Sequence, residues 1–257
     1  MFAWLTERRR KRLLETPFPP AWTEILESNV AAYKLLDDAE RKRLRDLVQV
    51  FIAEKHWEGA GGLELTDEIK VTIAGTGCQL LLGRDHDLFA EVDSIVVYPS
   101  TVVLPEHPRS FFDPGARPIG TGTPIQGVVH RGGPLVVAWD SALRGARDPR
   151  DGRNVVIHEL AHKIDYLDGA ADGTPPLPSG SARRAWLAAF APAYLAHKER
   201  AERGERSFLD DYAVTNEAEY FAVATEAFFE RPHALARELP DVYAALREYY
   251  SLDLAAR

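Results

Sequence analysis

The stretch that decides the fold reads Val155-Val156-Ile157-His158-Glu159-Leu160-Ala161-His162-Lys163-Ile164-Asp165. Its apolar residues recur at helical spacing. Because an α-helix has about 3.6 residues per turn, His158 and His162 lie one turn apart on one face, where their imidazoles can converge on one metal ion. Glu159 lies about 100° around the helix, within reach of a water on that metal but not of the ligand position. The pattern is typical of a zinc site that activates water.

The alternative interpretation is a buried histidine pair that bonds backbone carbonyls. In a chain of 257 residues with 8 histidines, chance gives about 0.25 His pairs at this spacing, and about 0.02 with Glu in the second position. Two stacked imidazoles in an apolar helix are also costly without a shared partner. Both considerations favour a metal site.

A hydrolytic zinc site needs three protein ligands and one position for water. Cys78 is the single cysteine, which excludes a cysteine-rich site. Asp168, six residues after the second histidine, would be carried about 9 Å along the helix axis, away from the metal. The apolar segment 216–230 holds Glu219 and Glu226, which are seven residues apart and therefore on one face. Buried carboxylates need a cation or a metal, so both are alternatives for the third ligand.

The composition excludes several classes of protein. With 46% apolar and 27% charged residues, the chain buries a large core and is not disordered. A net charge of −8 gives nucleic acid no general reason to bind, and 8–12, the one basic cluster, is interpreted as the solvated face of a first helix. No window approaches the roughly 18 apolar residues of a membrane span. A single cysteine fits a reducing compartment, and we expect a cytoplasmic protein without nucleic-acid or membrane partners.

We expect one domain, 1–257, of the α+β class: mostly helical, with a small mixed or antiparallel sheet. Residues 1–60 form its helical N-terminal part, 61–145 its sheet-containing part and 146–257 its helical catalytic part. Expected helices in the last part are 153–167, 181–203, 216–230 and 233–249. Asp148 or Asp151 is available to cap the first of these, and Gly169 to end it.

The sheet is predicted from short apolar runs in the middle of the chain. Residues 94–103 form the clearest strand, whereas 69–82 fit either short strands or a buried helix. Residues 127–130 and 135–139 flank a Gly- and Pro-containing turn and are expected to form a hairpin.

These residues together resemble the Mlc titration factor A family of bacterial zinc-dependent peptidases. The resemblance is carried by 158–169 and by Glu219-Tyr220-Phe221-Ala222-Val223, and it extends over most of the chain. It implies a gluzincin-like site on a zincin-type fold similar to the catalytic domain of anthrax lethal factor. The metal ligands that it implies for a single Zn²⁺ ion are His158, His162 and Glu219.

The resemblance also assigns roles to residues around the metal. It makes Glu159 the general base, and it selects Glu219 over Glu226 because the family's ligand directly precedes an aromatic pair. Tyr212 matches a tyrosine that, in the related toxin fold, reaches the metal-bound oxygen, which makes it a candidate catalytic residue. Asp165 and Glu226 become candidates for supporting the ligands from behind.

The function implied by the resemblance is hydrolysis of peptides, with aminopeptidase-like cleavage of short peptides as one form. Gly133, Pro134, Leu135 and Val136 begin a stretch that is either an exposed edge strand, on which an extended substrate pairs, or an interior strand. The alternative function is a regulatory protein that sequesters a transcriptional repressor, with zinc structural or regulatory. Glu159 favours the enzyme, because metal ligation alone does not use it.

Overall fold

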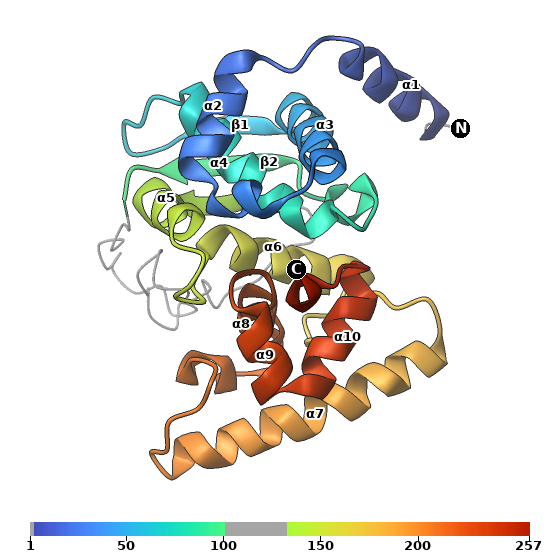
Figure 1. Cartoon of the computed structure of the whole chain (residues 1–257), viewed down its shortest axis with the longest axis vertical. Coiled ribbons are helices and arrows are strands. Elements are labelled where there is room, and N and C mark those ends of the chain that lie inside the picture. The colour runs from blue at the N-terminus through green and yellow to red at the C-terminus, as the bar shows by residue number, and fades with distance from the viewer. Residues whose placement is uncertain (1–2, 101–132) are drawn as a thin grey trace, which may run out of the picture.

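The computed structural model describes residues 3–100 and 133–257 (Figure 1). Helix α6 crosses the middle of the molecule, between a group that contains α1–α5 with the sheet and a group that contains α7–α10 (Figure 1). It packs against α4 and the sheet on one side and against α8 on the other. The helix that carries the histidine motif is therefore shared by both groups.

The helices before the sheet begin at clear sequence signals. Pro20 starts α2, where its missing N–H costs nothing. Asp37 caps α3 in a reciprocal pair with Glu40, and Thr66 caps α4 through its side-chain oxygen. The bounds are α1 Ala3–Leu14, α2 Pro20–Asn29, α3 Asp38–Glu54 and α4 Asp67–Gly77. Of the two alternatives for 69–82, the buried helix is confirmed.

The sheet is small and parallel in the part of the chain that the structure describes. Its order is β1–β2–β3, with strands His56–Gly59, Ser94–Tyr98 and Leu135–Ala138. His56 is aligned with Ser94, and Ile95 with Leu135. The prediction of an α+β fold is confirmed, but the expected mixed or antiparallel direction is wrong. The long connection from β2 to β3 exceeds the roughly one dozen residues that a parallel crossover needs.

The expected hairpin falls partly on residues 127–130, which lie outside the described residues, as do 101–103 of the expected strand 94–103. The second half of the expected hairpin is β3, which pairs in parallel with β2. This strand ends at Ala138, because Trp139 begins helix α5, Trp139–Arg147. This helix was not expected from the sequence. Asp140 in its first turn and Arg147 in its last turn match the helix dipole.

The C-terminal helices follow the expected pattern with one exception. Their bounds are α6 Val155–Asp165, α7 Gly180–Glu202, α8 Glu217–Glu230, α9 Pro232–Glu238 and α10 Pro240–Tyr250. The single helix expected over 233–249 is wrong, because Pro240 has no N–H to continue a helix and instead occupies the first turn of a new one. No helix in 3–100 or 133–257 is both long and apolar enough to cross a membrane.

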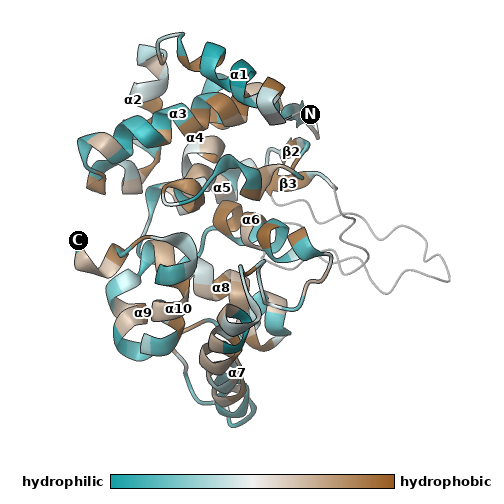
Figure 2. Cartoon of the chain, turned by 90° about the vertical axis from the view of Figure 1, so that its right-hand side faces the viewer, coloured by the Kyte–Doolittle hydropathy of each residue, from teal (hydrophilic) through white to brown (hydrophobic). Residues whose placement is uncertain are grey.

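The core surrounds α6 and α8. Figure 2 shows hydrophobic residues on β2, β3 and α6, and mainly hydrophilic residues along α1. From Ala218 to Phe228 every residue of α8 is buried, so this largely apolar helix is enclosed on all sides and carries two glutamates, Glu219 and Glu226, into the core. The basic cluster of α1 is largely exposed, but Arg10 is partly buried and pairs with Glu54 at 2.8 Å.

The segment between α6 and α7 is fixed at Gly173. Its N–H donates to Asp165 Oδ2 at 3.0 Å, and its carbonyl accepts from Trp186 Nε1 at 3.0 Å. Gly173 has a φ of +73°, and a Cβ added to it would lie 2.4 Å from the Glu217 carbonyl oxygen. The position therefore requires glycine on two grounds, and it joins the end of α6 to α7 and to the start of α8.

Replacing Gly173 by Ala is expected to lower the free energy of unfolding by about 2 kcal/mol or more, since a left-handed backbone and a backbone clash add. Gly204 is the matched control, because its φ is +69° but no atom of the described residues lies within 4 Å of an added Cβ. Gly204→Ala should cost only about 1 kcal/mol. Urea denaturation measures the unfolding free energy of both variants. Equal losses of unfolding free energy in the two would contradict the close packing at Gly173.

Candidate metal centre

Two helix caps set the positions of the candidate ligands. Asn154 caps α6, where its Oδ1 accepts from the Ile157 N–H at 3.2 Å. Asn216 caps α8 in the same way and accepts from the Glu219 N–H at 2.9 Å. The predicted caps for α6, Asp148 and Asp151, are wrong. Each Asn directly precedes the first turn of its helix, which is the signal that identifies it.

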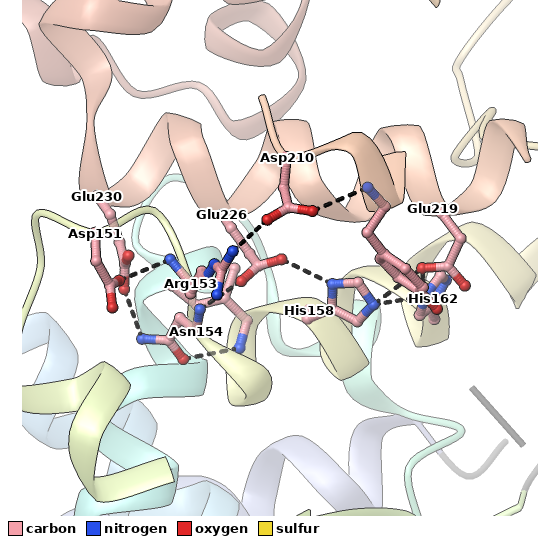
Figure 3. A network of polar contacts seen from close by, with 11 residues as sticks. Asp151, Arg153, Asn154, His158, His162, Asp210, Glu219, Glu226 and Glu230 are labelled. Atoms are coloured by element: carbon pink, nitrogen blue, oxygen red, sulfur yellow. Dashed lines mark hydrogen bonds and ion pairs between the residues drawn. The ribbon is translucent and has the colours of Figure 1, made fainter. Parts of the chain in front are cut away.

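The packing of α6 against α8 brings three side chains together, as Figure 3 shows. One ligand atom from each of His158, His162 and Glu219 lies within 4.8 Å of the others. Glu219 Oε2 is 3.1 Å from His158 Nε2 and 3.3 Å from His162 Nε2, and the two ring nitrogens are 3.1 Å apart. His158 and Glu219 are buried, while the half-buried His162 lies toward the surface.

The donor set fits a metal ion. Glu219 Oε2 is buried and makes no hydrogen bond of acceptable geometry to any described residue, although both ring nitrogens are close. Two imidazole nitrogens and one carboxylate oxygen are a ligand set of catalytic zinc sites, which leave a fourth position for water. A cation between them would satisfy all three atoms at once.

Glu226 supports His158 from behind. Its Oε1 lies 2.7 Å from His158 Nδ1, and its Oε2 accepts from the Asn154 N–H. A carboxylate at Nδ1 favours the neutral tautomer with the proton on that nitrogen, and in this neutral form the lone pair of Nε2 faces Glu219 and His162. This is the arrangement that a metal-binding histidine uses.

The neighbouring charges shift the pKa values of His158 and Glu219 in the direction opposite to the effect of burial. Burial alone lowers the pKa of His158, but Glu226 and Glu219 outweigh it and raise that pKa well above its usual range. Burial alone raises the pKa of Glu219, but the two neighbouring histidines outweigh it and lower that pKa to about 2. Glu219 is therefore ionised at neutral pH, as a metal ligand must be.

Asp165 contacts the following loop instead of the histidines. Its Oδ2 accepts from the Gly173 N–H, and its Oδ1 is buried without a hydrogen bond to a described residue. Burial raises the pKa of Asp165 to about 7, against the hydrogen bond from Gly173. The side chain thus fixes the end of α6.

Glu159 and Tyr212 both lie next to His158, one of the three candidate ligands. Glu159 is half-buried next to His158 on α6, and its charge contributes to the raised pKa of that histidine. Tyr212 belongs to a short 3₁₀ turn, Asp211–Val214, that precedes α8. Its ring centroid is 6.1 Å from that of His158, and both residues line a cleft of about 570 Å³.

The stretch that begins at Gly133 lies against α6. The Lys163 ammonium, one residue after His162, donates to the Gly133 carbonyl at 2.7 Å. Strand β3 is the last in the order β1–β2–β3, and so it is an edge strand within the described residues. Pro134 is exposed, Leu135 is buried and Val136 is half-buried.

Two of the contacts around the site were not predicted from the sequence. Arg153 pairs with Asp210, whose other oxygen accepts from the Tyr212 N–H at 2.9 Å. Asn154 donates from Nδ2 to Glu230 Oε1 at 3.0 Å. Glu230 lies four residues after Glu226, so helical spacing places the two on one face, but no sequence signal indicates the partner on α6.

Comparison with known proteins gives consistent matches over most of the chain. The model of the family described as glucose-regulated metallo-peptidase M90 matches residues 4–251. An uncharacterized protein of Synechocystis is 32% identical over 252 residues, which cover 97% of this chain and 90% of that protein. Mlc titration factor A of Serratia proteamaculans is 30% identical over 232 residues, covering 86% and 84%. The protein of that name from Edwardsiella ictaluri is 32% identical over 224 residues, covering 85% and 82%.

Glu219→Ala is expected to remove zinc from the purified protein, because it deletes the only carboxylate oxygen among the three converging atoms. Glu226→Ala should leave the site able to fill but weaken its affinity by roughly 10- to 100-fold, the usual effect of losing a partner behind a ligand. Metal analysis after dialysis against a dilute zinc buffer measures both. If Glu226→Ala empties the site and Glu219→Ala leaves it full, the wrong carboxylate has been assigned.

Proposed function

The chain belongs to the glucose-regulated metallopeptidase family M90, and from this premise we propose that it hydrolyses peptide bonds with one Zn²⁺ ion held by His158, His162 and Glu219. The observation that carries the proposal is the convergence of these three side chains, with a buried Glu219 oxygen that accepts no hydrogen bond from the described residues. The family supports the reaction class, and the donor set supports zinc.

Each protein group next to the metal has a role in the proposed reaction. Zinc, when bound, supplies a Lewis acid for the scissile carbonyl and lowers the pKa of a bound water toward about 7. Glu159 accepts the proton of the attacking water and passes it to the leaving amine. The Tyr212 hydroxyl donates to the carbonyl oxygen of the substrate as that oxygen gains negative charge.

The proposed substrates are short peptides, cleaved in the manner of an aminopeptidase. An extended peptide would align with the start of β3, at Gly133, Pro134, Leu135 and Val136, where main-chain groups of an edge strand provide hydrogen bonds. The contact from Lys163 to Gly133 supports this, because it holds that stretch beside the motif helix.

A second candidate function is the binding of a transcriptional repressor. The name of the relatives from Serratia proteamaculans and Edwardsiella ictaluri, Mlc titration factor A, supports it, and zinc would then be structural or regulatory. Such a partner is cytoplasmic, a location that also suits a chain whose single cysteine, Cys78, is buried and reduced. The two functions are separated by Glu159, which repressor binding does not require.

Glu159→Gln keeps the shape of the side chain but cannot accept a proton. Zinc content should stay at the wild-type level, while hydrolysis of a peptide library should fall by a factor on the order of 10² or more. Unchanged hydrolysis would remove Glu159 from the mechanism. A wild type that holds zinc but cleaves nothing in a broad library would favour the repressor-binding protein.

Tyr212→Phe keeps the ring beside His158 and removes only the hydroxyl. If the hydroxyl stabilises the developing charge, kcat should fall by roughly 10²–10³, while zinc content and Tm stay close to wild type. The alternative is a tyrosine that serves only in packing. A variant with wild-type kcat, or one that loses stability and activity together, would support that alternative.

A further inference from the structure

Behind the candidate ligands, a chain of buried polar contacts runs from α6 to the far end of α8 (Figure 3). His158 Nδ1 contacts Glu226, Glu226 accepts from the Asn154 N–H, and Asn154 Nδ2 donates to Glu230 Oε1. Asn154 also accepts from the Ile157 N–H through Oδ1. One residue thus contacts the helix that carries the histidines and two carboxylates of the helix that carries Glu219.

Capping of α6 does not explain all of these contacts. A cap needs only a side-chain oxygen at position 154, and Ser or Asp supplies one as well as Asn. The Nδ2 donor and its acceptor Glu230 are additional. A glutamate at this buried place is costly, since Glu230 Oε2 is buried without a hydrogen bond to a described residue.

The electrostatics of Glu230 support a role in holding Asn154 and not in carrying charge. Burial raises the pKa of Glu230 to about 8, against the hydrogen bond from Asn154, and the charge of Glu226 raises it further. At neutral pH Glu230 is therefore mostly protonated, so it offers an oxygen to Asn154 without placing a second negative charge beside Glu226. A glutamine at this position has the same properties.

We propose that Asn154 and Glu230 are positioning residues of the metal centre: Glu230 holds the Asn154 side chain, and the Asn154 N–H holds Glu226 against His158 Nδ1. This orientation keeps the proton on Nδ1 and directs the lone pair of Nε2 toward the metal. The inference rests on the proposed metal site, and it adds two residues that touch neither metal nor substrate.

Zinc affinity without any peptide tests the proposal. Asn154→Ser keeps the capping oxygen and removes the donor, Glu230→Ala removes the acceptor, and Glu230→Gln retains it. Affinity is measured on the metal-depleted full chain by titrating zinc against a chromophoric chelator, with the fold checked by circular dichroism. Thr66→Ala, which removes the side-chain cap of α4 and leaves the contacts of Asn154 and Glu230 in place, is the control for a general loss of stability.

Asn154→Ser and Glu230→Ala should each weaken zinc binding by roughly 10-fold, the lower end of the range for partners of metal ligands, because both act through Glu226. Glu230→Gln should stay within about threefold of wild type, and Thr66→Ala should lower Tm without changing affinity. Wild-type zinc affinity in Asn154→Ser would overturn the proposal, even if that variant is less stable. If Glu230→Ala fails to fold, the result for Asn154→Ser alone decides the test. A wild type that binds zinc but cleaves no peptide would refute the peptidase and leave this test intact.

Discussion

The contact between the buried imidazole of His158 and the two carboxylates of α8 is the constraint on which the rest of the structure depends. Glu219 and Glu226 lie on a helix that is otherwise apolar and enclosed by the core. Ionised groups in such surroundings are strongly destabilising unless each meets an opposite charge or a hydrogen-bond donor. The histidines of α6 meet this need in part. The Glu219 oxygen that makes no hydrogen bond within 3–100 and 133–257 identifies where a further positive charge belongs.

The rest of the fold holds α6 and α8 in the required relation. Helix α4 packs against the opposite side of α6, where a Cβ added to Gly77 would lie 2.4 Å from Leu160 Cδ1. Beyond α6, Gly173 connects its end to α7 and α8. Before α6, Arg153 is paired to the turn that carries Tyr212. Sites built on helices whose ends are fixed in this way keep their ligands within the narrow tolerance that catalysis requires.

What the sequence predicted was local, and what it did not predict was long-range. The spacing of His158 and His162 and the shared face of Glu219 and Glu226 follow from the geometry of one helix each. Whether neighbouring strands run parallel or antiparallel depends on which strands meet across a long connection. The alternation of apolar and polar residues along one strand does not indicate this. The cap of α6 was expected at Asp148 or Asp151, but Asn154 caps it, because the helix begins at Val155 and not at the expected residue 153. Glu230 acquires its partner only when α8 packs against α6.

X-ray absorption at the zinc edge of the zinc-loaded protein tests the central claim most directly, because it reports the atoms that surround the metal. The account predicts a shell of nitrogen and oxygen neighbours at about 2.0–2.1 Å, with the outer scattering of two imidazole rings and no sulfur. A sulfur neighbour at about 2.3 Å, or a shell without two imidazoles, would contradict a site formed by α6 and α8.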